Sequence, residues 1–243
     1  ALAVRRPFAG RGLFMLVLGA MTWWLLAAAG ELWATGLPAR RAWATMAWPG
    51  IALLPCAWAA FLADLAGPRR RSATARLTAL VAPPALVTLA VATNPWHGQF
   101  YGPDTRMIEG LAGPTVAYDH GPAFYAASAV LYGYLATALA TLVRALSRSD
   151  AIHRPLFRAL LAATVLPIAG NLAYVLGGVT LFGFDPTPFL FAAVFLVIGG
   201  AFLLRRALDL EDMARDVLFE AAADGIVVVD TAGRLVAANA VAR

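Results

Sequence analysis

Six long apolar stretches constrain this chain more than any other feature. A helix needs roughly 20 mostly apolar residues to cross the hydrocarbon core of a bilayer. The composition agrees, because 61% of the 243 residues are hydrophobic and only 14% are charged, whereas a soluble domain is typically about 25% charged. We therefore predict an all-α polytopic membrane helix bundle, with spans near residues 12–33, 43–65, 76–93, 122–146, 156–178 and 187–204.

The basic residues predict how these spans are oriented. All 19 are arginines, and 13 of them fall on one side: before the first span, in the second and fourth connections, and after the last span. Because arginine accumulates in short cytoplasmic loops, we expect both observed ends of the chain to face the cytoplasm. The long connection near residues 94–121 should then lie outside. We expect a multi-pass protein of the cell inner (plasma) membrane.

After Arg206 the composition changes twice. Acidic residues first interleave with apolar residues that recur at helical spacing, as on one stripe of a helix. A β-branched run from Ile226 and a turn signal at Gly233 then predict the start of a mixed α/β domain. We predict a transmembrane sensor domain over residues 1–206, a cytoplasmic signalling helix over 207–223 and a truncated α/β domain over 224–243. The apolar stripe, which would pair with a second copy in a homodimer, contains Leu210, Met213, Val217 and Ala221.

Polar residues in the outer half of the predicted spans indicate a ligand-binding pocket. Strongly polar groups are costly inside a bilayer and are functional candidates for that reason. The direction of each span places its polar residues at the level of the outer loops, which carry Tyr101, Asp119 and His120. The predicted ligand-binding residues are Glu31, Trp48, Asn94, His97, Asn171, Tyr174, Asp185 and Thr187.

Several of these residues have a simpler interpretation. Tryptophans such as Trp48 gather at membrane interfaces or pack between helices, and Asn171 would equally suit an interhelical hydrogen bond. His97 is either a pH sensor or an ordinary loop histidine. The pocket therefore has to be judged by whether these side chains meet.

Other kinds of site find no support in the sequence. The chain has no lysine, so it cannot form the Schiff base of a retinal protein. The single Cys56 lies in an apolar stretch, where it would serve as a small buried residue. The three histidines lie on separate connections, and Ser128 has no evident base. We expect no catalytic residue, metal site or cofactor in this segment, and no nucleic-acid partner.

Four groups of residues together resemble a known family. They are Trp23-Trp24 through Glu31-Leu32, Asn94-Pro95-Trp96-His97-Gly98, Leu166-Pro167 with Gly170–Tyr174, and Asp185-Pro186-Thr187-Pro188. In this order and spacing they look like the seven-helix N-terminal sensor of bacterial and archaeal histidine kinases. The segment from Asp224 to Asp230, with Gly233 to Asn239, is similar to the start of a PAS domain.

The resemblance implies a homodimeric sensor whose PAS domain leads to a kinase core and, through that output domain, to a cytoplasmic response regulator. Related sensors also precede diguanylate cyclase or phosphatase domains. The family has seven spans and the sequence predicts six, so we expect a first helix to precede Ala1 and the output domain to follow Arg243.

The sequence therefore favours a receptor for an external small molecule or a membrane-borne signal, with membrane lipid around it. A transporter is one alternative, although transporters favour polar groups at the midplane and an internal repeat. A plain membrane anchor for the output domain is the other alternative.

Overall fold

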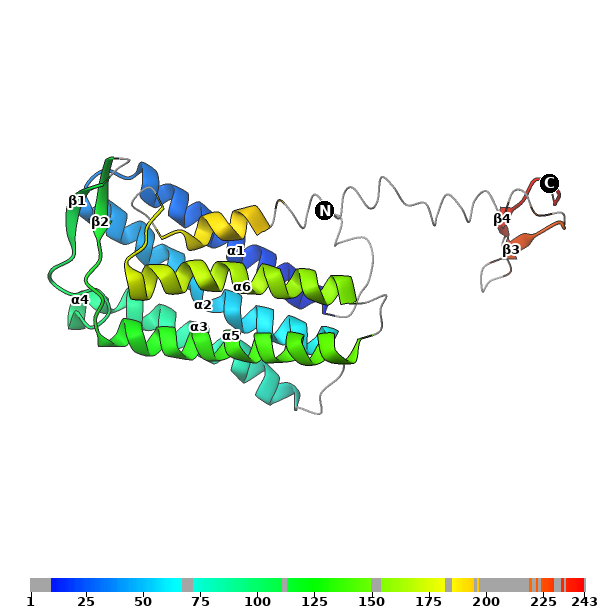
Figure 1. Ribbon diagram of the computed structural model, residues 1–243, viewed down its shortest axis with the longest axis horizontal. Helices are drawn as coiled ribbons and strands as arrows, with labels where there is room; N and C mark the ends of the chain where they lie inside the picture. Colours follow the sequence, from blue (N-terminus) through cyan, green and yellow to red (C-terminus); the bar gives the residue numbers. More distant parts are fainter. Residues whose placement is uncertain are drawn as a thin grey trace. The chain divides into compact units, whose positions relative to one another are not determined.

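The computed structural model describes residues 10–66, 72–110, 113–149, 154–181, 185–194 and 196, and parts of the segment from 219 to 242. The chain divides into two compact units, Ala1–Ala193 and Val194–Arg243. The first unit is mostly helical, and the second contains a small β-hairpin. Figure 1 shows the helices of the first unit side by side, with the chain reversing direction between them.

Among the described residues of the first unit, five helices are long and apolar enough to cross a membrane. Each has at least 20 residues, which corresponds to about 30 Å or more at 1.5 Å per residue. They coincide with the first five predicted spans, although α2 begins six residues before the predicted 43–65. Their bounds are α1 Arg11–Trp33, α2 Leu37–Leu65, α3 Ala73–Ala92, α5 Pro122–Arg148 and α6 Arg154–Gly177.

The sixth predicted span is described only at its start. Residues 187–194 are helical, as is residue 196, and the rest of the predicted span lies outside the described residues. The predicted signalling residues Leu210, Met213, Val217 and Ala221 also lie outside them.

Helix α2 lies at the centre of the first unit and contacts α1, α3 and α5, while α6 packs against α5. Gly50 lets α1 and α2 approach closely, because a Cβ at this position would overlap the carbonyl oxygen of Ala20. Small residues promote such contacts between membrane helices, where apolar burial alone gives little preference for protein over lipid. One buried cluster joins α2 to α3 and α5 around Trp48 and Phe124. A second, around Phe61 and Leu142, lies nearer the other end of α2 and α5.

A short helix and a β-hairpin cover one end of the bundle, which we call the hairpin end (Figure 1). Helix α4 spans Asn94–His97, strand β1 Arg106–Gly110 and strand β2 Gly113–Ala117. The two strands pair antiparallel, with Arg106 opposite Ala117 and Gly110 opposite Gly113. The sequence predicted only a long connection here, so the hairpin is an addition from the structure.

At the opposite end, α2 and α3 are joined by a polar contact. The Arg76 guanidinium forms an ion pair with the Asp64 carboxylate, and the Ser72 hydroxyl accepts a hydrogen bond from the backbone N–H of Ala75 at 3.1 Å. The serine therefore caps the first turn of α3, where N–H groups lack helical partners.

The second unit contains an antiparallel hairpin of strand β3 Val227–Val229 and strand β4 Leu235–Ala238. This matches the two strands predicted around Ile226 and Leu235. Asn239 is fully buried. Its side-chain oxygen accepts hydrogen bonds from the N–H groups of Ile226 (2.9 Å) and Ala242 (3.0 Å), and its amide donates to the Asp224 carbonyl. Asn239 thus joins the segment before β3 to the segment after β4.

Candidate functional site

The hairpin end begins with a loop that Asn94 holds in place. Asn94 is 4% exposed. Its side-chain oxygen accepts hydrogen bonds from the backbone N–H groups of Phe100 (2.7 Å) and Tyr101 (3.1 Å), and its amide donates to the Tyr101 carbonyl at 3.0 Å. Buried backbone groups require partners of this kind. Asn94 therefore fixes the path of the loop over residues 98–103.

This loop rests on an aromatic cluster inside the bundle. The Trp48 indole N–H donates to the Tyr101 hydroxyl at 2.7 Å. The Trp48 ring lies edge-on to the rings of Phe100 (centroids 4.7 Å apart) and Phe124 (5.9 Å), an arrangement that aromatic quadrupoles favour. Burial raises the pKa of the Tyr101 hydroxyl well above its ordinary value of 10. Tyr101 therefore serves as a neutral hydrogen-bonding group at neutral pH.

A second tyrosine connects the segment after β2 to α1. The Tyr118 hydroxyl donates to the Glu31 carboxylate at 2.6 Å, and its ring centroid lies 5.0 Å from that of Tyr101. Burial and the neighbouring Glu31 charge raise the pKa of Tyr118. Glu31 is itself half-buried at the end of α1, where the charge of Arg40 attracts its carboxylate and that of Asp185 repels it. The Glu31 carboxylate is therefore paired inside the protein.

A chain of hydrogen bonds connects α5 and α6 to the start of the last helical segment. The Tyr132 hydroxyl on α5 donates to the Asn171 side-chain oxygen on α6. The Asn171 amide then donates to the Thr187 hydroxyl at 2.9 Å, and Thr187 donates to the Asp185 carboxylate. We call these four residues the polar relay.

Asp185, at the end of the relay, lies outside the helices, and its surroundings change its pKa. Burial raises its pKa, while the hydrogen bonds from the Thr187 hydroxyl and backbone N–H partly oppose that rise. The Thr187 N–H lies 2.9 Å from the carboxylate oxygen. Because Asp185 and Glu31 also repel each other electrostatically, the charge at Asp185 affects both the relay and the end of α1.

His120 lies between the aromatic cluster and α6. Its ring stacks on Phe124, with centroids 3.8 Å apart and planes inclined by 20°, and it lies edge-on to Tyr174 at 6.5 Å. Burial lowers its pKa below the ordinary value of 6.5, although Asp119 acts in the opposite direction. The stacked ring is therefore neutral at neutral pH.

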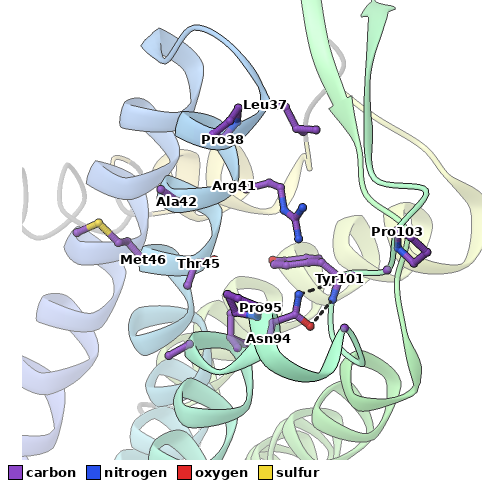
Figure 2. Close-up of a pocket in the computed structure, with 14 residues that line it drawn as sticks. Leu37, Pro38, Arg41, Ala42, Thr45, Met46, Asn94, Pro95, Tyr101 and Pro103 are labelled. Carbon is purple, nitrogen blue, oxygen red and sulfur yellow. Dashed lines mark hydrogen bonds between the residues drawn. The ribbon is translucent and has the colours of Figure 1, made fainter.

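A groove of about 790 Å³ opens at the hairpin end between the first turns of α2, the end of α3, α4 and the loop over 98–103. Its lining is mostly apolar. Figure 2 shows Arg41 directed from α2 toward Tyr101, with the hydrogen bonds between Asn94 and Tyr101 nearby. Among the described lining residues, Arg41 is the only charged one.

The structure brings together some of the predicted ligand-binding residues and separates others. Asn171, Thr187 and Asp185 share the polar relay, and Glu31 and Tyr174 interact electrostatically with Asp185. Trp48 and Asn94 meet through Tyr101 instead, and Asn94 is the predicted residue that lines the groove.

His97 lies apart from these contacts. It is exposed, and its ring nitrogens contact the Ala90 carbonyl (3.1 Å) and the Gln99 N–H (2.9 Å) around α4. This placement serves the local turn.

Sequence reasoning did not select Arg41, Tyr118 and Tyr132. Arg41 falls in the connection before the predicted span 43–65, where an arginine is ordinarily a loop charge, and the tyrosines have partners 87 and 39 residues away in the chain. No local pattern marks pairs at such separations, since they depend on how the helices pack.

The described residues contain no group of three or more His, Cys, Asp or Glu arranged to hold a metal ion. Hydrogen-bonded tyrosines, an amide and partly paired carboxylates suit the recognition of a ligand or a proton and the linking of helices.

Comparison with known protein families identifies a match over most of the chain. A family model described as the N-terminal 7TM region of histidine kinase matches residues 1–211. No curated protein and no solved structure matches the chain at a significant level.

Proposed function

Because this chain belongs to the family of N-terminal 7TM regions of histidine kinases, we propose that it is the sensor module of a two-component sensor histidine kinase. It is a multi-pass membrane protein with several spanning helices. In this proposal it receives an external small-molecule or membrane-borne signal and passes that signal to a cytoplasmic PAS domain and a kinase core. The kinase core would then phosphorylate a response regulator.

The observation that carries the proposal is the polar relay. Tyr132 and Asn171 lie on helices of the bundle, whereas Asp185 and Thr187 begin the helical segment that leads toward the C-terminus. A rearrangement at the hairpin end therefore acts on the start of that segment through hydrogen bonds. A plain anchor needs no such connection between buried polar groups, which are costly unless they are fully paired.

The arginine distribution supports the orientation in the proposal. Eleven of the 13 arginines that the sequence assigns to the cytoplasm lie before the first span or in the second and fourth connections. Those among them that the structure describes lie at the end of the bundle opposite the hairpin end. In this orientation the protein lies in the inner membrane, its hairpin end faces outside, and its C-terminus lies in the cytoplasm. Reporter fusions at Gly102 and Ser149 test this orientation, and a cytoplasmic signal from Gly102 would contradict it.

The C-terminal part of the proposal concerns the PAS domain and the dimer. The antiparallel β3–β4 hairpin supports the start of a PAS domain. The apolar stripe Leu210, Met213, Val217 and Ala221 supports a signalling helix that pairs in a homodimer.

Phosphorylation of the full-length protein in lipid nanodiscs tests the proposed function. Asn171→Ala and Tyr132→Phe each break the polar relay, so we expect the ATP-dependent phosphorylation level to change severalfold in either direction. Thr137→Ala is the matched control, because within the described chain the Thr137 hydroxyl bonds to its own helix alone, at the Gly133 carbonyl. Wild-type phosphorylation in both correctly inserted relay variants would favour the anchor.

A further inference from the structure

One face of α2 gives the groove an elongated apolar wall with a single cation. Pro38, Arg41, Ala42, Thr45 and Met46 line the groove, and their spacing of three or four residues places them on one side of the helix. This face is about 12 Å long at 1.5 Å per residue. The opposite wall, from the end of α3 and from α4, is also mostly apolar. The groove is thus long enough for a medium-length acyl chain.

The charge in the groove has no acidic counterpart. No aspartate or glutamate is among the described residues that line it, and within the described chain the Arg41 guanidinium makes no hydrogen bond or ion pair. Its neighbour Arg40, by contrast, is buried and donates to the Ala34 carbonyl at 3.0 Å. A half-buried guanidinium in an apolar groove attracts an anion, and its planar fork fits a carboxylate through two parallel hydrogen bonds.

We propose that this groove binds an amphiphilic carboxylate, with the carboxylate on Arg41 and the apolar chain along the exposed face of α2. The groove volume of about 790 Å³ lies within the range of about 300–1,000 Å³ that is typical of small-molecule sites. The inference rests on the proposed sensor function, for which it names the class of ligand.

A ligand in the groove would contact Tyr101, which connects the groove to the rest of the hairpin end. Tyr101 lines the groove, accepts a hydrogen bond from Trp48 on α2 and packs on Tyr118 at 5.0 Å. Tyr118 in turn donates to Glu31 on α1. Occupancy of the groove therefore bears on the contacts between the loop, α2 and α1.

Photolabelling of the full-length protein in nanodiscs of zwitterionic lipid tests the site. The probe is decanoate carrying a diazirine, and peptide mass spectrometry locates its attachment. We expect saturable labelling within residues 37–46 or 91–103 that unlabelled decanoate removes and decanol does not. Arg41→Gln should reduce labelling by about tenfold or more, because a hydrogen bond to a charged group contributes about 1.5–3 kcal/mol.

Two further variants distinguish binding in the groove from a nonspecific effect of losing a positive charge. Arg106→Gln removes a charge from the exposed strand β1 at the same end and should leave labelling unchanged. Ala42→Phe keeps Arg41 but fills the groove, so labelling should fall even though the charge remains.

Three results would overturn the proposal: equal labelling of Arg41→Gln, competition by decanol as strong as by decanoate, or displacement of the probe by an anionic phospholipid at equal concentration. Because labelling is measured without reference to phosphorylation, it is independent of the sensor test. Labelling that depends on Arg41 without any change in phosphorylation would support the ligand site and contradict the sensor function.

Discussion

Replacing Asn94 with alanine should open the loop over residues 98–103. The variant leaves two buried donors, the N–H groups of Phe100 and Tyr101, without the oxygen that accepts them at 2.7 and 3.1 Å. Each unsatisfied buried group costs about 1–3 kcal/mol, so the loop should lose about 2–6 kcal/mol of local stability. Asn94→Asp keeps an acceptor for both N–H groups, but it replaces the donor to the Tyr101 carbonyl with a buried carboxyl group, whose desolvation adds a cost of its own.

Hydrogen exchange reports this loss directly, because the two amides that lose their acceptor are themselves observable. A loss of 2 kcal/mol corresponds to roughly thirtyfold faster exchange. Gln99→Ala is the control, since this exposed side chain makes only a 3.4 Å contact with the His97 carbonyl. Exchange in Asn94→Ala as slow as in the control would refute the role of Asn94 as the group that fixes the loop.

Three further predictions concern helix packing and pH. Gly50→Ala should destabilise the protein by about 1–3 kcal/mol, because the added methyl group would overlap the facing backbone of α1. Gly133 has open space around it, so Gly133→Ala should raise stability by up to about 1 kcal/mol. Thermal unfolding of both variants in the same detergent measures the difference. Burial raises the pKa of Asp185 in the folded protein, so the stability of the wild type should fall as the pH rises above 3.8, the ordinary pKa of this carboxyl group. Asp185→Asn should remove this pH dependence in thermal melts between about pH 4 and pH 8. Burial lowers the pKa of His120, so stability should fall as pH drops below about 6.5, and His120→Phe should abolish that loss while keeping the stack.

The helices could be predicted because their signal is local. Apolar length alone located α1, α3, α5 and α6 to within three residues at each end. Helix α2 extends further because Pro38 suits a first turn, and because Arg40 is buried at the hairpin end instead of lying in a loop. The family resemblance, carried by motifs spread along the chain, is confirmed over residues 1–211.

The pairing of the site residues could not be predicted in the same way. Helix direction placed Glu31 and Asn171 at the same end of the bundle, but it could not say that Tyr118 and Tyr132 are their partners. Rotation of each helix about its axis decides that, and it depends on close contacts such as the one at Gly50. Strands β1 and β2 were missed because they are five residues each and lie among glycines and prolines that also suit an irregular loop.

Whether the bundle drives its output through the last helix is tested most directly by insertions after Ala214. Each added residue turns the remainder of the helix by about 100°, whereas seven restore the facing stripe of a heptad-paired helix. We expect one or two inserted residues to lock or abolish the regulated phosphorylation of the full-length protein, and seven to restore it largely. Phosphorylation that is indifferent to the length of the insertion would mean that the linker is a flexible tether, and it would contradict transmission through a continuous helix.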